Sequence, residues 1–317
     1  MEKRVVDEIT KKELMNMVRC PYCEDSILAV SSKESFLDCR QCERRFTSKD
    51  GIIDFIEDKD LKEVKSVNIK YHDMEAEYYD NIHMHMQADS KLYQGLVERF
   101  DFGGKTVLDI GTGTGFVLDN FHKDARFIIL DISANMLKRN LKKHNNVILG
   151  LRADSEQIPL MNSSVDMITL SSVLHHLPDP AKALDEIYRV LKPKGILFIF
   201  HEPAESPRGM IYRVVRKALR IFFPKYKKDV KREEKIKDYA GKIFGVEKDE
   251  ASKKMEEYNR KTTAQESFDP KKLLPVEKYL IKETKYYYTS DTFFCRLMLF
   301  IFPKKSGDQF YIIAEKK

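Results

Sequence analysis

The segment Val107–Gly115 constrains the fold of this 317-residue chain more than any other part of the sequence. It reads Val-Leu-Asp-Ile-Gly-Thr-Gly-Thr-Gly, an apolar run that ends in Asp109 and continues into glycines at positions 111, 113 and 115. Glycine lets the backbone turn tightly and approach a ligand closely, because no Cβ stands in the way. The spacing matches neither the dinucleotide-binding loop nor the phosphate loop, and no lysine follows to hold a triphosphate. On its own, the loop indicates a nucleotide-like ligand other than ATP.

The residues after this loop predict an open parallel α/β sheet. After a first strand at Val107–Asp109, further strands are expected at Arg126–Asp131, Asn146–Leu151, Val165–Val173 and Ile196–Phe200. Ser133 is the expected N-cap of a helix over Ala134–His144, and Asp179-Pro180 begins the next helix. Acids follow three of the strands, at positions 109, 131 and 154. Ligands of open parallel sheets bind at the carboxyl ends of the strands, so these acids predict one site.

The stretch from about residue 105 to residue 202 resembles the class I S-adenosylmethionine-dependent methyltransferases. Within that superfamily it is most similar to the branch with the ubiquinone and menaquinone biosynthesis enzymes. The resemblance rests on the glycine loop, on Asp131-Ile-Ser-Ala-Asn-Met-Leu, and on Leu174-His-His-Leu with the later Ile187-Tyr-Arg-Val-Leu-Lys-Pro-Lys-Gly-Ile-Leu. It implies a Rossmann-like sheet of seven strands and S-adenosylmethionine as the methyl donor.

The resemblance also implies roles for individual residues. The glycine loop and Asp109 would hold the methionine end of the cofactor, Asp131 the ribose hydroxyls, and Asp154 the adenine amino group, with Ala153 beside the ring. The implied cofactor-binding residues are Asp109, Gly111, Thr112, Gly113, Gly115, Asp131, Ile132, Ala153, Asp154 and Ser171. A helix cap or a loop charge would explain any one of these acids, but three at successive strand ends favour a binding site.

Methyl transfer from a sulfonium is a direct displacement, so the protein mainly aligns the reactants, excludes water and removes a proton where needed. No fixed triad is therefore expected. The candidate bases at the strand ends are His175, His176, His201 and Glu202. A role in shaping the pocket floor remains the alternative for the histidine pair. Further candidates, for the substrate mouth, lie in the helix expected over residues 71–80: Tyr71, His72 and Tyr79.

Four cysteines predict a second functional unit near the start of the chain. Cys20, Cys23, Cys39 and Cys42 have the Cys-x2-Cys-x15-Cys-x2-Cys spacing of a zinc ribbon. Disulfides are the alternative, but residues 1–17 lack the apolar core of a signal peptide, and a reducing compartment favours metal. Four thiolates leave no open position, so we expect a structural Zn²⁺. The unit resembles the zinc-ribbon modules that precede an rRNA guanine methyltransferase or activate tRNA methyltransferases.

These patterns divide the chain into three expected parts: a zinc-ribbon module at 1–57, a linker with cap helices at 58–104, and the methyltransferase domain at 105–317. The last part carries a basic helical insertion at about 203–275, since residues 203–317 hold 28 Lys and Arg against 17 Asp and Glu. Residues 208–223 predict a basic amphipathic helix that lies on a membrane or caps the site. Residues 293–302 are apolar enough for a core helix, a substrate wall or lipid contact. Strands six and seven are expected at Tyr279–Thr289 and Gln309–Glu315.

The methyl acceptor is the least determined part of the prediction. A hydrophobic or lipid-like small molecule is favoured by the resemblance and by the apolar tail. RNA is the alternative, because of the zinc ribbon and the basic carboxyl half. The segment Ser171-Ser-Val-Leu-His-His lacks the Asn/Asp-Pro-Pro-Tyr type of motif common in base-nitrogen methylation. A non-catalytic subunit is disfavoured by the intact loop and acids. We expect a cytoplasmic protein, with peripheral membrane contact through 208–223 and 293–302.

Overall fold

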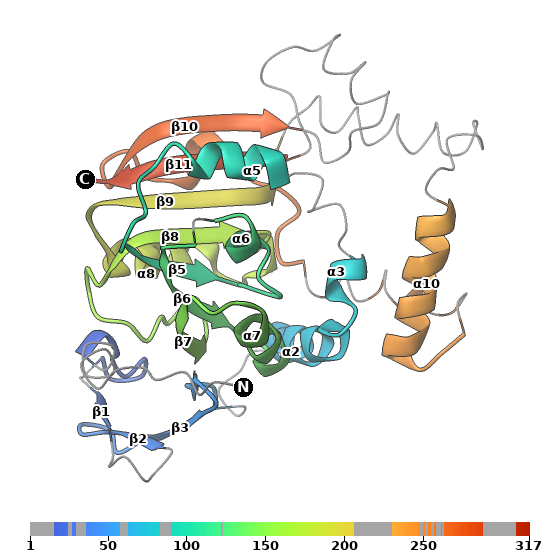
Figure 1. Ribbon diagram of the computed structural model, residues 1–317, viewed down its shortest axis with the longest axis horizontal. Coiled ribbons are helices and arrows are strands. Elements are labelled where there is room, and N and C mark those ends of the chain that lie inside the picture. Colours follow the sequence, from blue (N-terminus) through green and yellow to red (C-terminus); the bar gives the residue numbers. More distant parts are fainter. Residues whose placement is uncertain are drawn as a thin grey trace.

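The five predicted strands form a parallel sheet at the centre of the molecule (Figure 1). The computed structural model describes residues 16–24, 27–29, 36–57, 63–82, 90–121, 123–205, 230–247, 263–287 and 309–317, with isolated positions between 250 and 261. The central strands are β5 Thr106–Ile110, β6 Arg126–Asp131, β7 Val147–Arg152, β8 Val165–Ser171 and β9 Leu191–Pro203. They lie side by side in the order β7-β6-β5-β8-β9.

Two antiparallel strands extend this sheet beyond β9. They are β10 Tyr279–Tyr287 and β11 Gln309–Lys316, and β11 lies between β9 and β10. The seven strands therefore have the order β7-β6-β5-β8-β9-β11-β10. The predicted fold class, a mostly parallel α/β sheet closed by an antiparallel pair, is confirmed.

Two of the parallel strands differ from the prediction by more than one residue at an end. The fourth strand, β8, ends at Ser171 rather than at Val173, because Ser172 adopts a left-handed backbone with φ of 59°. The fifth strand, β9, begins at Leu191 and continues to Pro203, well beyond Ile196–Phe200. Its register shifts near the start, where Leu191 pairs with Val165 and Ile196 pairs with Met167. Lys194, which has a left-handed backbone with φ of 62°, lies within this irregular part of the strand.

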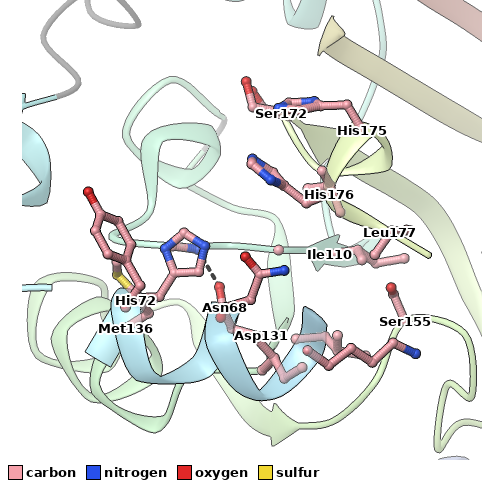
Figure 2. A pocket seen from close by; sticks show the side chains of 18 of the residues that line it. Asn68, His72, Ile110, Asp131, Met136, Ser155, Ser172, His175, His176 and Leu177 are labelled. Carbon is pink, nitrogen blue, oxygen red and sulfur yellow. Dashed lines mark hydrogen bonds between the residues drawn. The ribbon is translucent and has the colours of Figure 1, made fainter. Parts of the chain in front are cut away.

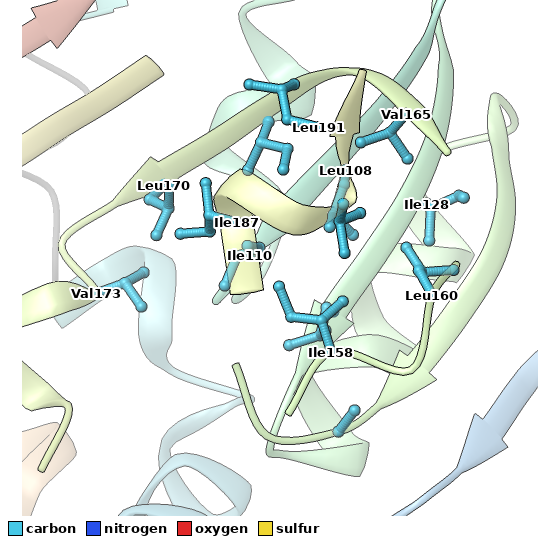
Figure 3. Close-up of a cluster of buried hydrophobic side chains, with 14 of the residues drawn as sticks. Leu108, Ile110, Ile128, Ile158, Leu160, Val165, Leu170, Val173, Ile187 and Leu191 are labelled. Carbon is cyan, nitrogen blue, oxygen red and sulfur yellow. The ribbon is translucent and has the colours of Figure 1, made fainter. Parts of the chain in front are cut away.

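Side chains of the parallel strands are buried on both faces of the sheet, as continuous apolar runs require. On one face, Leu108, Ile110 and Ile128 pack with Ile187 and Leu191 in a cluster whose members are drawn in Figure 3. The opposite face buries a second cluster that includes Val107, Phe127, Ile129, Met167 and Phe198. Each fully buried large aliphatic side chain stabilises the fold by roughly 1.5–3 kcal/mol.

Helices cover both faces of the sheet. The helices of the described residues are α2 Glu63–Glu75, α3 Tyr79–Ile82, α5 Ser90–Val97, α6 Phe116–Asp119, α7 Ala134–Lys143, η2 Leu174–His176, α8 Pro180–Val190, α10 Val230–Phe244 and α12 Pro270–Leu273. The two predicted caps are present, since Ser133 accepts from the Met136 amide and Asp179 accepts from the Lys182 amide. Each cap satisfies an amide that would lack a partner inside its helix.

The cysteine-rich segment is joined directly to the sheet. Its strands are β1 Ile27–Ala29, β2 Phe36–Cys39, β3 Arg45–Lys49 and β4 Ile52–Asp54, paired antiparallel in sequence order. The last of them, β4, pairs in parallel with β7, with Ile52 opposite Gly150. Asp54 also contacts Arg152 at 2.8 Å. The expected boundary at residue 57 therefore separates two parts that share one sheet.

The basic insertion leaves the sheet after β9 and returns to it. Ala204 forms a parallel bridge with Phe268, and the Ala264 amide donates to the His175 carbonyl at 2.8 Å. Between these points α10 packs near α3 (Figure 1), where the rings of Tyr239 and Tyr78 lie 5.2 Å apart. The predicted segments 208–223 and 293–302 lie outside the described residues. Across the described part of the chain, no helix combines the length and apolarity needed to cross a bilayer.

Candidate functional site

A cavity of about 550 Å³ lies at the carboxyl ends of the parallel strands. Strands β5, β6, β8 and β9 and the residues that follow β7 contribute its floor, and α2 bounds it on one side. Figure 2 shows His72 and Asp131 on the side of α2 and β6, and His175 and His176 on the side of η2. Of the ten predicted cofactor residues, seven line this cavity: Gly111, Gly113, Asp131, Ile132, Ala153, Asp154 and Ser171.

The glycine loop needs its glycines for different reasons. Gly111 has φ of 62°, and a Cβ there would lie 2.4 Å from Val173 Cγ2. Gly115 has φ of 95°, and its Cβ would lie 2.4 Å from His144 Cε1. Gly113 has φ of 50°, and a Cβ there would meet Tyr79 at 3.8 Å. Packing therefore excludes larger residues at the outer two positions, while Gly113 is the loop glycine most open to the cavity.

Asp131 fixes the loop from the end of the neighbouring strand. Its Oδ2 accepts from the Gly113 amide at 2.8 Å and its Oδ1 accepts from the Ser133 amide at 2.9 Å. Burial raises the pKa of this carboxyl, which the two amides partly offset. A carboxylate has about four acceptor sites, so each oxygen retains the capacity to accept a ligand hydroxyl. This geometry fits the predicted role in binding two ribose hydroxyls.

Asp154 is engaged by protein groups that the sequence did not indicate. Its Oδ2 contacts the ammonium of Lys65, and its Oδ1 accepts from the Glu156 amide at 2.9 Å. Lys65 also contacts Glu156 at 2.8 Å. Lys65 and Asn68 come from α2 and line the cavity. An adenine amino group at Asp154 would therefore share this carboxylate with Lys65, a residue with no recognisable motif in the sequence.

Three predicted cofactor residues lie behind the cavity wall rather than in it. Asp109 is buried, and its carboxylate accepts from Thr112 Oγ1 at 2.7 Å and from Thr169 Oγ1 at 2.6 Å. The Thr112 hydroxyl in turn accepts from Asn140 Nδ2 at 2.7 Å. Gly115 begins α6 and packs against His144. These residues support the loop from beneath, so direct cofactor contact stays a prediction for them.

Asp109 should make the stability of the protein depend on pH. Burial raises its pKa from 3.8 to about 7, against the opposing effect of the two threonine hydroxyls. Between these two pKa values, the folded state holds a proton that the unfolded state has lost. The stability that this proton contributes is therefore present below about pH 4 and disappears as the pH rises through about 7. We expect Asp109→Asn to unfold like the original chain at low pH and to be more stable at higher pH, by up to about 4 kcal/mol.

Urea unfolding from about pH 4 to about pH 7 measures the free energy of unfolding of Asp109→Asn and of the unmodified protein. Asp166→Asn is the matched control, because the Thr106 amide and Lys192 hold the pKa of that carboxyl below its usual value despite partial burial. Asp166→Asn should lower the stability of the protein at pH values above the normal carboxyl pKa, which is the opposite of the change expected for Asp109→Asn. Equal pH profiles for Asp109→Asn and the unmodified protein would contradict the assignment to Asp109.

The candidate bases divide into two groups. His175, His176 and His201 line the cavity. Glu202 does not, since it is fully buried and its carboxylate accepts from the amides of Val173, Leu174 and His175. The same carboxylate lies 2.9 Å from His175 Nδ1. Because an ionised carboxylate only accepts hydrogen bonds, Glu202 in that state would place the proton of His175 on Nδ1 and orient its ring.

His201 sits in a distorted part of β9. It has φ of 55°, an uncommon backbone for a non-glycine residue, and the pairing with β11 shifts register beside it. Its Nδ1 lies 2.9 Å from Ser171 Oγ, and its amide donates to Tyr287 Oη at 3.1 Å. A bulge at this point redirects the side chain toward the cavity, as bulges beside active sites often do.

The predicted mouth residues all line the cavity, together with one that the sequence did not suggest. Tyr71, His72 and Tyr79 come from α2 and α3. The added residue is Glu75, fully buried, with its Oε1 2.7 Å from His72 Nδ1. The i, i+3 spacing of these two residues on a helix could have indicated the pair. Their burial could not have been inferred, because α2 has little amphipathic pattern.

The four predicted metal ligands meet in one place. The sulfurs of Cys20, Cys23, Cys39 and Cys42 all lie within 4.8 Å of one another, with Cys20–Cys42 at 3.7 Å and Cys23–Cys39 at 3.3 Å. A tetrahedral zinc site with Zn–S bonds near 2.3 Å separates its sulfurs by about 3.8 Å. The donor set and its spacing therefore fit one zinc ion with little rearrangement.

Sequence comparisons identify the central part of the chain. Residues 108–199 match a family model described as a methyltransferase domain. The ubiquinone/menaquinone biosynthesis C-methyltransferase UbiE of Enterobacter sp. (strain 638) is 35% identical over 120 residues, which are 34% of this chain and 48% of that protein. The enzyme of the same name from Klebsiella pneumoniae (strain 342) is 36% identical over the same shares. The chain thus spans about half the length of these relatives.

Solved structures also resemble the chain. One is from the complex of the Haloferax volcanii Trm112 methyltransferase activator with a methyltransferase, at 15% identity and a TM-score of 0.45, covering 76% of this chain and 92% of that one. Another is magnesium protoporphyrin IX methyltransferase from Synechocystis PCC 6803, at 15% identity and a TM-score of 0.44, covering 75% and 86%. The sequence matches confirm the predicted resemblance to S-adenosylmethionine-dependent methyltransferases over the central region.

Proposed function

We propose that this protein, which contains a class I methyltransferase domain, transfers the methyl group of S-adenosylmethionine to a hydrophobic or lipid-like small molecule. One observation carries the proposal. Within the matched domain, a single cavity joins Gly113 and Asp131 to His175 and His176. A donor held at the first pair would therefore face an acceptor held near the second.

The lining residues fit the proposed cofactor. The open position at Gly113 and the carboxylate of Asp131 would hold the methionine end and the ribose. Ile132 and Ala153 would flank the adenine, whose amino group would approach Asp154 beside Lys65. When bound, S-adenosylmethionine supplies a methyl group already activated by the sulfonium charge. The residues of the chain then only need to align the acceptor, exclude water and take up a proton.

The acceptor half of the cavity supports the choice of a hydrophobic substrate. Leu177, Pro178 and Pro203 line it, beside polar groups from Ser172 and Thr263. A mostly apolar wall with a few placed polar groups is usual for small-molecule sites. The relatives named above as ubiquinone/menaquinone C-methyltransferases support the same class. We extend the proposal to peripheral membrane contact through the basic segment 208–223 and the apolar segment 293–302.

We also propose that the four cysteines bind one structural Zn²⁺. The sulfur spacing fits a tetrahedral ion, and four thiolates leave no open position for a substrate. Because β4 pairs with β7, the ion would stabilise a part of the molecule that shares the catalytic sheet. No step of methyl transfer needs it.

Transfer of a labelled methyl group from S-adenosylmethionine into fractionated cell extract tests the acceptor class. We expect the label in the organic-solvent phase, because the acceptor wall is apolar. The matched control is the Asp131→Ala variant, which should transfer no label. Label that is released by nuclease would contradict the small-molecule proposal and favour RNA, the alternative suggested by the basic carboxyl half.

A further inference from the structure

We propose that His72, held by Glu75, accepts the proton that the methyl acceptor loses, and that its charge alternates with that of the cofactor. The inference rests on the proposed function, because it concerns the same cavity and the same donor. It assigns a catalytic role to α2, which contributes none of the bases expected from the sequence. The role follows from the position of the pair, its tautomer and the charges around it.

The position of the pair is the first step. His72 lies in the last turn of α2 and Glu75 ends that helix, so both face the cavity that they line. Figure 2 shows the rings of His72 and His176 reaching into the cavity from α2 and from η2. Their centroids are 6.3 Å apart. An acceptor that lies beside His176 would therefore be within reach of His72.

The second step is the tautomer of His72. Glu75 is fully buried, and its Oε1 lies 2.7 Å from His72 Nδ1. A carboxylate only accepts hydrogen bonds, so Nδ1 carries a proton in both charge states of the ring. Nε2 is then the atom that gains or loses a proton. A buried carboxylate that orients an imidazole in this way also stabilises the imidazolium.

The third step is the set of charges that face His72. They are the carboxylates of Glu75 and Asp73 on α2 and of Asp131 on β6, and the rings of Tyr71 on α2 and His176 on η2 also lie against His72. Burial lowers the pKa of His72, but the hydrogen bond and charge of Glu75, with Asp131 and Asp73, raise it above its usual value overall. A proton on His72 would therefore be stabilised by Glu75 and Asp131, two carboxylates that have little contact with solvent.

The fourth step is the charge balance of methyl transfer in this cavity. A sulfonium cofactor brings positive charge toward the same carboxylates, so its binding favours loss of the His72 proton. In the reaction the S–CH₃ bond breaks with its electron pair remaining on sulfur, and a bond forms between the methyl group and the acceptor atom X. The proton of X–H moves to Nε2 of His72. Positive charge thus passes from sulfur to the imidazole, and the net charge of the cavity does not change.

Cofactor binding alone tests this coupling, since S-adenosylhomocysteine lacks the sulfonium charge. Titration calorimetry from about pH 5.5 to about pH 8.5 would measure Kd for both compounds. Below the pKa of His72, we expect the affinity for S-adenosylmethionine to rise about tenfold per pH unit, while that for S-adenosylhomocysteine changes little. Repeating the titrations in buffers of different ionisation enthalpy should show proton release on binding of the sulfonium compound alone.

Variants assign the effect to the pair. His72→Asn should remove the pH slope for S-adenosylmethionine and keep the affinity for S-adenosylhomocysteine, which also shows that it folds. Glu75→Gln should move the slope to lower pH. Glu77→Gln, which removes an exposed carboxylate close by, should behave like the unmodified protein. Burial raises the pKa of Asp109 to about 7, but Asp109 is present in every variant of the series, so any slope that it contributes would survive in His72→Asn.

The outcomes separate the two proposals. Equal pH slopes for the two compounds, or a slope that survives in His72→Asn, would overturn the role of His72 and leave the proposed function intact. A slope lost in His175→Asn but kept in His72→Asn would assign the proton to the other histidine. Failure of both compounds to bind at every pH would instead contradict the proposed function itself.

Discussion

Asp131→Ala should lower the affinity for S-adenosylmethionine by at least about 100-fold, as measured by titration calorimetry. The substitution removes the acceptor for the Gly113 and Ser133 amides, so the loop loses its anchor. It also removes the group proposed to bind the ribose hydroxyls. Hydrogen bonds to a charged group are worth roughly 1.5–3 kcal/mol each, and two of them account for the expected loss.

A second variant tests the same site from the loop. Gly113→Val places a β-branched side chain at a φ of 50° and directs it toward the cavity and Tyr79. We expect it to abolish binding while the fold remains, because the other two loop glycines still pack normally. Asp124→Ala, at an exposed turn before β6, is the control and should bind normally. Normal affinity in both site variants would refute the placement of the cofactor.

Cys39→Ser should reduce the zinc content from about one ion per chain to near zero in elemental analysis. The melting temperature should fall on the order of 10 °C, because metal binding by such a site contributes directly to folding and the affected strands share the main sheet. Both effects should be reproduced by prolonged treatment of the unmodified protein with a strong chelator.

Cys295→Ser provides the matched control, since that cysteine lies outside the predicted ligand set. It should keep both the zinc content and the melting temperature. A protein purified without reductant exposure that contains a disulfide between any two of Cys20, Cys23, Cys39 and Cys42, and no zinc, would disprove the metal site. The spacing of the sulfurs alone is compatible with either state, so the measurement decides.

The central sheet could be predicted from the sequence because its signals are local. A buried parallel strand is a short apolar run, and Arg126–Asp131 is both the predicted and the observed second strand. The cap at Ser133 and the proline after Asp179 likewise mark helix starts through neighbouring backbone groups. The cysteine spacing belongs to the same class of signal, since each pair spans a single turn.

Features that depend on distant contacts could not be predicted. Lys65 contacts Asp154 although 89 residues separate them in the sequence, and no local pattern near either residue predicts this contact. The longer course of β9 depends on its register with β8 and β11, and the left-handed backbone at His201 depends on the bulge between them. Glu202 illustrates the same limit, because an acid after a strand resembles a catalytic group until its three backbone donors are known.

The pairing of β4 with β7 also covers the outer edge of the parallel strands. Without it, β7 would be an outer strand whose row of amides and carbonyls could pair with another chain. The apolar composition of β7 is typical of a strand that is paired on both sides, so exposure of its edge would favour aggregation. Residues 52–54 satisfy this row, and the strands continue outward through β3 and β2 to short β1. The cysteine-rich segment thus covers the edge of β7, and a metal ion that holds this segment in place would also keep that edge covered.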